Sequence, residues 1–157
     1  MPFCGLYGTI DASSTGADQK GALMSNLKIH HIGYLVKKME PAKKTFESLG
    51  YQVEQDTVYD HIRKVDICFL NKDGCRVELV SPASPDSVVA GLIKKYKNTP
   101  YHICYETDDY EAAFAKLRAD GFLPTESLTP TPAPALGGRS VIFLVSAAIG
   151  MIELIAD

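Results

Sequence analysis

The sequence predicts an α+β fold built from two tandem β-α-β-β-β modules. Short runs rich in β-branched and aromatic residues alternate between apolar and polar positions, which is typical of strands. Two longer segments place apolar residues at helical spacing, and each directly follows one of these runs. The same order of elements occurs twice along the chain, so we expect two half-domains that share one core by pseudo-symmetry.

The first module is predicted over residues 27–82. It opens with the strand-like KIHHIGYLV, and a helix follows in EPAKKTFESLG, where Pro41 suits the first turn and Gly50 ends the pattern. Three further strands complete the module, and the turn NKDG joins the last two. These strands are expected at 51–59, 63–71 and 75–81.

A connector over residues 83–99, with a short helix from about Asp86, leads into the second module over residues 100–157. The second module is expected to contain a helix with an aspartate cap and a glycine stop at 108–121, and a proline-rich loop at 129–139. Its strands are expected at 101–107, 122–128, 139–146 and 150–157.

Residues 1–26 differ from the rest of the chain. They are rich in glycine, serine, alanine and aspartate and show no sustained period. They also lack the basic start and apolar stretch of a signal peptide. We therefore interpret residues 1–26 as a flexible N-terminal leader.

Composition limits the classes of function. The chain has 157 residues, a net charge of −3 and no basic run, which argues against a nucleic-acid partner. Its longest apolar runs are too short to span a bilayer, so no membrane partner is expected. The four cysteines have neither metal-ligand nor redox spacing, and we interpret them as reduced thiols of a cytoplasmic protein.

The repeat places two histidines and two glutamates at equivalent positions. HIGYLV matches HICYET, which pairs His31 with His102, and RVELVSP matches MIELIAD, which pairs Glu78 with Glu153. Because side chains alternate along a strand, these four residues are expected to face away from their apolar neighbours. Tyr101 is one of these neighbours and is expected on the apolar side. The preceding His30 falls on the apolar side and is interpreted as structural or at the surface.

An acidic side chain inside an apolar strand is costly to bury without a partner. Here the same arrangement occurs twice, and each glutamate belongs to a repeat that also holds a histidine. Two imidazoles and two carboxylates that converge on one point suit a divalent metal ion. The sequence therefore predicts a metal site formed by His31, Glu78, His102 and Glu153.

From Leu27 to its end the chain resembles the vicinal oxygen chelate superfamily, which includes glyoxalase I, methylmalonyl-CoA epimerase, bleomycin-resistance proteins and extradiol dioxygenases. The resemblance implies paired βαβββ modules whose mixed sheet curls into a cup around one divalent ion per chain, Co²⁺, Ni²⁺, Mn²⁺ or Zn²⁺. It assigns the same four residues as ligands, from the first and last strands of each module.

Four retained ligands favour the two branches of this superfamily that move a proton next to a carbonyl. The connector VELVSPASPDSVVAGLIKKYKNTPYHICYETDD resembles that of methylmalonyl-CoA epimerases, which makes a metal-dependent epimerase the first choice. Glyoxalase I is the alternative, because Ile62, Val88 and Tyr101 depart from the epimerase pattern. A non-catalytic small-molecule binding or resistance protein is the third hypothesis.

The resemblance also implies individual roles. Glu153 is the first candidate for the base that removes the proton, and Asp60, shortly before the third strand, is the second. The substrate is expected to be an acyl thioester or a thiol adduct, and the protein is expected to form a homodimer.

Overall fold

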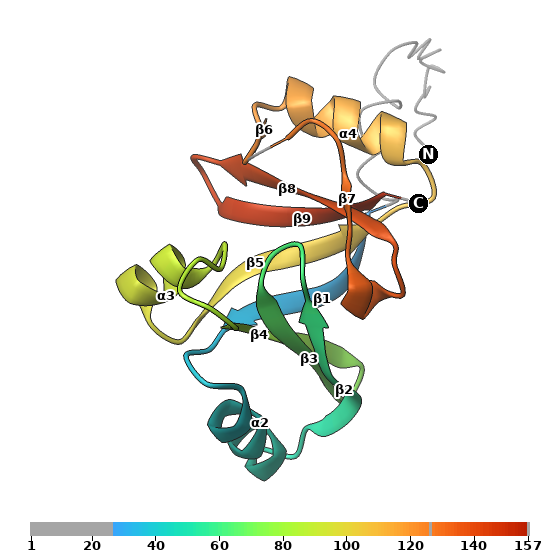
Figure 1. Ribbon diagram of the computed structural model, residues 1–157. Coiled ribbons are helices and arrows are strands. Elements are labelled where there is room, and N and C mark those ends of the chain that lie inside the picture. Colours follow the sequence, from blue (N-terminus) through green and yellow to red (C-terminus); the bar gives the residue numbers. More distant parts are fainter. Residues whose placement is uncertain (1–26, 126, 157) are drawn as a thin grey trace, which may run out of the picture.

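The computed structural model describes residues 27–125 and 127–156, which form one nine-stranded mixed sheet with helices packed against it (Figure 1). The strand order is β2-β3-β4-β1-β5-β9-β8-β6, and β7 pairs with β8. The predicted α+β class with βαβββ modules is confirmed. The leader predicted at residues 1–26 lies outside the described residues.

The first module follows the predicted order closely. Its elements are β1 (Lys28–Leu35), α2 (Met39–Ser48), β2 (Gln52–Asp60), β3 (Val65–Lys72) and β4 (Cys75–Pro82). Gly50, after α2, has a φ of 91°, a left-handed conformation that glycine adopts without strain. This glycine therefore ends the helix, as the sequence predicts.

The second module follows a connector that contains α3 (Ala90–Tyr96). Its elements are β5 (Thr99–Glu106), α4 (Tyr110–Ala119), β6 (Leu123–Pro124), β7 (Thr131–Pro132), the 3₁₀ helix η1 (Pro134–Leu136), β8 (Ser140–Ser146) and β9 (Gly150–Ala156). The predicted aspartate cap is Asp109, whose carboxylate accepts a hydrogen bond of 3.0 Å from the backbone N–H of Ala112.

Two predicted elements are shorter than expected. The connector helix begins at Ala90, not near Asp86, because the Asp86 carboxylate pairs with Lys64 and accepts from the Ser84 hydroxyl in the preceding turn. The strand expected over residues 122–128 is reduced to the two residues of β6. The proline-rich loop supplies β7, which pairs antiparallel with β8, and the 3₁₀ helix η1.

The two modules meet at the centre of the sheet. There β1 pairs antiparallel with β5, while β1 pairs parallel with β4 and β5 pairs parallel with β9. The four central strands are thus the first and last strands of each module. The predicted module boundaries at residues 82 and 100 stay a prediction, since hydrogen bonding runs continuously across the sheet.

The two faces of the sheet have different partners. On the outer face, α2 packs over Leu70, Leu79 and their neighbours, and α4 packs over Leu144 and Leu154. On the inner face, two further apolar clusters form the interior of a cup. They contain Leu35, Val65, Ile67, Phe69, Val80 and Val89 in one half, and Cys104, Ala133, Val141 and Ile155 in the other.

Within the described ranges, no helix is both long enough and apolar enough to cross a membrane.

Candidate metal centre

Four buried polar side chains meet on the inner face of the sheet. His31, Glu78, His102 and Glu153 are each at most 5% exposed, and one ligand atom from each lies within 4.8 Å of the other three. The Nε2 atoms of His31 and His102 are 3.2 Å apart. Glu153 Oε2 lies 3.2 Å from the first of these nitrogens and 3.4 Å from the second. The structure therefore brings together all four predicted ligands.

The carboxylates arrive by simple strand alternation. In β4, Val77 and Leu79 pack outward against α2, so Glu78 between them points into the cup. In β9, Ile152 and Leu154 pack outward against α4, so Glu153 points into the cup from the opposite side. Glu78 Oε2 lies 3.4 Å from His31 Nε2 and 3.6 Å from His102 Nε2, which completes the group.

The cluster is electrostatically coupled. Burial alone would lower the pKa of His31, but the adjacent carboxylates of Glu78 and Glu153 raise it to about 9. Burial would raise the pKa of Glu153, but the two imidazoles that lie against its carboxylate hold that pKa well below its usual range. The two carboxylates therefore favour the protonated form of His31, and the imidazoles favour the ionised form of Glu153.

The donor set fits a divalent ion. Ligand atoms about 2.1 Å from a shared ion stand roughly 3 Å apart when at right angles, close to the observed separations of 3.2–3.6 Å. Glu153 Oε2 and His102 Nδ1 are buried without a hydrogen-bond partner among the described residues. An ion would satisfy the first of these two atoms.

Two β-bulges place extra side chains on the inner face. Pairing of β1 with β5 slips between Ile29 and His31 and again between Gly33 and Tyr34, so His30 and Tyr101 have no partner across the ladder. The prediction that these two residues face the apolar outer side is therefore wrong. The ring of His30 contacts Phe69 and that of Tyr101 packs in the inner cluster around Leu35.

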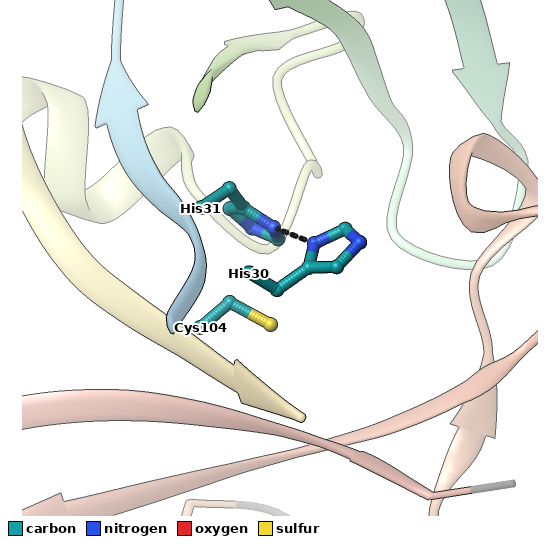
Figure 2. A group of neighbouring side chains, drawn as sticks. All are labelled: His30, His31 and Cys104. Carbon is teal, nitrogen blue, oxygen red and sulfur yellow. Dashed lines mark hydrogen bonds between the residues drawn. The ribbon is translucent and has the colours of Figure 1, made fainter. Parts of the chain in front are cut away.

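The ring of His30 contacts the ring of His31 through their Nδ1 atoms. The Nδ1 atoms of the two rings are 2.8 Å apart, as the dashed line in Figure 2 marks. Arg76 Nη1 donates to His30 Nε2 at 2.8 Å, and the same guanidinium pairs with Glu54. Because arginine only donates, His30 Nε2 accepts this bond. Sequence alternation missed this contact because the bulge reverses the expected side.

Small residues lie beneath the two ligand rings. In the register of β1 and β5, His31 stands opposite Cys104 and His102 stands opposite Gly33. A Cβ on Gly33 would overlap the imidazole of His102, so only glycine admits this ring. Cys104 lies beside His30 and His31 (Figure 2). Burial, followed by the charge of Glu153, raises the pKa of its thiol and keeps it protonated.

A cavity of about 250 Å³ opens onto this cluster. Glu78 and Glu153 form part of its floor, and Val88, Val89 and Leu92 line it beside α3. Its other lining residues include Asp60, Arg63, Tyr101, Phe143 and Met151.

Asp60, the second predicted acid–base residue, lies in this cavity wall but is fully engaged. Its Oδ1 accepts from the backbone N–H groups of Ile62 and Arg63 at 2.9 Å each, and its Oδ2 accepts from Arg63 Nη1 at 2.7 Å. The Arg63 guanidinium also donates to Thr131 and to the carbonyl of Pro132. The catalytic role of Asp60 stays a prediction.

Comparison with known proteins gives one family match. Residues 30–143 match the model of the glyoxalase/bleomycin resistance protein/dioxygenase superfamily. The matched segment includes three of the clustered residues and ends before β9, which carries Glu153.

Two relatives of this chain are named as epimerases. The mitochondrial methylmalonyl-CoA epimerase of Homo sapiens is 31% identical over 141 residues, which are 87% of this chain and 78% of the relative. The ethylmalonyl-CoA/methylmalonyl-CoA epimerase of Cereibacter sphaeroides is 29% identical over 123 residues, or 74% of this chain and 87% of the relative.

Solved structures share the fold. Methylmalonyl-CoA epimerase from Mycobacterium tuberculosis superposes with a TM-score of 0.70 at 20% identity, covering 83% of this chain and 87% of that one. A Streptomyces coelicolor methylmalonyl-CoA epimerase variant, solved in complex with 2-nitronate-propionyl-CoA, gives 0.69 at 23% identity, covering 83% and 96%.

Proposed function

Because the chain belongs to the glyoxalase/bleomycin resistance protein/dioxygenase superfamily and is a methylmalonyl-CoA epimerase-like enzyme, we propose that its substrate is methylmalonyl-CoA itself. In this proposal it inverts the carbon that lies between the thioester carbonyl and the carboxylate. The observation that carries the proposal is the His₂Glu₂ cluster on the floor of a cavity the size of an acyl group.

His31, Glu78, His102 and Glu153 would hold one divalent ion, and we propose Co²⁺, Ni²⁺, Mn²⁺ or Zn²⁺. Imidazole nitrogen and carboxylate oxygen are ligands that all four of these ions accept. When bound, the ion supplies a Lewis acid that polarises the substrate carbonyl and makes the neighbouring C–H bond more acidic. The orphaned Glu153 Oε2 and the 3.2–3.6 Å spacing of the ligand atoms support this assignment.

The carboxylate of Glu153 is the proposed base. Its Oε2 faces both imidazoles, so Oε1 is the oxygen assigned to take the proton from the substrate carbon. The C–H electron pair then moves onto the thioester carbonyl oxygen, and return of a proton to the other face gives the epimer. A positioned base of this kind contributes on the order of 10²–10⁴ in rate.

Glu78 is the better placed second acid–base group. It faces Glu153 across the two imidazoles and also lines the cavity. The Asp60 carboxylate, in contrast, already accepts three hydrogen bonds and serves to hold Arg63. We therefore assign Asp60 to the support of the cavity wall rather than to proton transfer.

A glyoxalase I reaction is the second candidate. One observation favours it: the engaged Asp60 leaves only carboxylates of the metal cluster to move protons in the cavity. In a glyoxalase I reaction, one carboxylate can remove a proton from one carbon and return it to the neighbouring carbon. A single carboxylate is then sufficient. A metal-independent binding protein would not need four buried ligands.

The proposed partners follow from the shape of the cavity. Only the acyl part of the thioester fits inside, so the coenzyme A tail leaves past α3, where Lys94 and Lys95 lie in the last turn. We propose that these lysines contact its phosphates.

We also propose a homodimer and a cytoplasmic location, while the human relative is described as mitochondrial.

The test compares two substrates on Co²⁺-loaded protein. We expect turnover of a single epimer of methylmalonyl-CoA, monitored by the change in its circular dichroism. We expect no turnover of the hemithioacetal of methylglyoxal and glutathione. Glu153→Gln should reduce the turnover of methylmalonyl-CoA by about 10²-fold or more, with Asp108→Asn, at an exposed carboxylate outside the cavity, as the control variant. Turnover of the hemithioacetal alone would replace the epimerase by glyoxalase I.

A further inference from the structure

Tyr101 is a hydrogen-bonding side chain in the cavity wall that the proposed reaction does not use. It directly precedes the ligand His102, and the two rings pack edge to face with centroids 4.4 Å apart. The bulge in β5 turns Tyr101 to the same side of the sheet as His102, where it lines the cavity. Bulges commonly re-aim a side chain next to an active site.

The repeat shows that this position differs between the modules. His30 precedes His31 just as Tyr101 precedes His102, and both stand on a bulge. The imidazole of His30 is held by His31 and Arg76. The hydroxyl of Tyr101 forms no hydrogen bond with the described residues and is not one of their buried unpartnered atoms, so it borders the open cavity. Of these two equivalent residues, only Tyr101 therefore offers an unpaired hydrogen-bond donor to the cavity.

The charges around the cavity define what this hydroxyl can bind. Two glutamates would balance the charge of a divalent ion, and Asp60 balances Arg63. The hydrogen atoms on both terminal nitrogens of Arg63 are occupied by Asp60, Thr131 and Pro132. The phenol hydroxyl of Tyr101 can donate one hydrogen bond, and it lies at the edge of the cavity, where neither of these charge pairs is left unbalanced.

We propose that Tyr101 is a specificity-determining catalytic residue whose hydroxyl donates a hydrogen bond to the carboxylate of an α-carboxyl acyl thioester. The inference rests on the proposed function, because it requires a substrate with that carboxylate. A hydrogen bond to a charged acceptor typically contributes about ten- to hundredfold in affinity. Tyr101 thereby selects α-carboxyl thioesters over thioesters that carry an alkyl group at the same position.

The test measures binding of two ligands by calorimetry to Co²⁺-loaded protein: methylmalonyl-CoA and isobutyryl-CoA, in which a methyl group replaces the carboxylate. Tyr101→Phe should weaken binding of methylmalonyl-CoA by about ten- to hundredfold and leave isobutyryl-CoA within about twofold. Tyr105→Phe is the matched control, since Tyr105 lies on the same strand but packs on the outer side with α4. The Co²⁺ absorption spectrum should be the same in all three proteins.

Three results would overturn the inference in distinguishable ways. Equal weakening of both ligands would make Tyr101 a packing residue only. No weakening of either ligand, while the wild type still prefers methylmalonyl-CoA and exchanges its α-proton, would remove Tyr101 from recognition and leave the proposed function intact. A wild type that binds the two ligands equally well and exchanges no α-proton would contradict the proposed function together with the role of Tyr101.

Discussion

Gly33 limits the position of one imidazole in the candidate metal centre through its size. It lies opposite His102 in the ladder, and the imidazole occupies the space where a Cβ would stand. The repeat marks each type of predicted ligand twice, and the structure places these four residues together. The repeat gave no sign of Gly33, since the need for glycine arises from a neighbour 69 positions away in the sequence and from the register that joins them.

Gly33→Ala should displace the ring of His102 and weaken Co²⁺ binding by about 10–100-fold, the usual loss when a ligand's support is disturbed. Competition with a chromogenic chelator measures the affinity. Gly91→Ala is the control, because a Cβ at Gly91 in α3 meets open space. Unchanged affinity in Gly33→Ala would show that His102 is not held as described.

The protonation of His31 gives a second prediction at this scale. Its pKa is raised from 6.5 to about 9, so the protonated ring stabilises the metal-free fold fully below pH 6.5, and this contribution is lost as the pH rises through 9. The free energy of unfolding of chelator-treated protein should therefore fall by on the order of 3 kcal/mol over this range.

Urea denaturation at pH 6, 7.5 and 9 measures this fall. His31→Gln, also free of metal, should show a much flatter dependence because it lacks the titrating ring. Stability of the metal-free wild type that rises between pH 6.5 and 9 would contradict the assigned direction of the shift.

At the scale of elements, alternation predicted side-chain direction where the strands are regular. Glu78 in β4 and Glu153 in β9 point inward as expected, between apolar residues that pack on the helices. It failed at His30 and Tyr101, because a bulge adds one residue to a strand without any local signature in its composition. The bulges depend on how β1 and β5 pair, which the sequence of neither strand reveals alone.

The N-terminus of α4 provides a prediction for an element. The Asp109 carboxylate accepts the N–H of Ala112 at 3.0 Å and is a side-chain N-cap. Asp109→Ala should lower the free energy of unfolding by about 1 kcal/mol, measured by urea denaturation. Asp108→Ala is the matched control, since the exposed Asp108 makes only a 3.9 Å ion pair with Lys28. Equal effects of the two substitutions would refute the cap.

At the scale of the whole molecule, the internal repeat explains why the site lies where it does. Each module supplies one histidine from its first strand and one glutamate from its last, and the antiparallel pairing of β1 with β5 brings the four together. The repeat made this convergence predictable. The path of the proline-rich segment, whose Thr131 and Pro132 bind Arg63, was not predictable, because that contact joins irregular segments of the two modules.

The central claim is that this cluster of four side chains binds a divalent ion and promotes removal of a proton next to a thioester carbonyl. The most direct measurement is proton NMR of methylmalonyl-CoA in D₂O with protein that was stripped of metal and reloaded with Co²⁺. We expect rapid loss of the α-proton signal, which chelator should abolish and renewed addition of Co²⁺ should restore. No loss of that signal, with one Co²⁺ bound per chain, would contradict the claim.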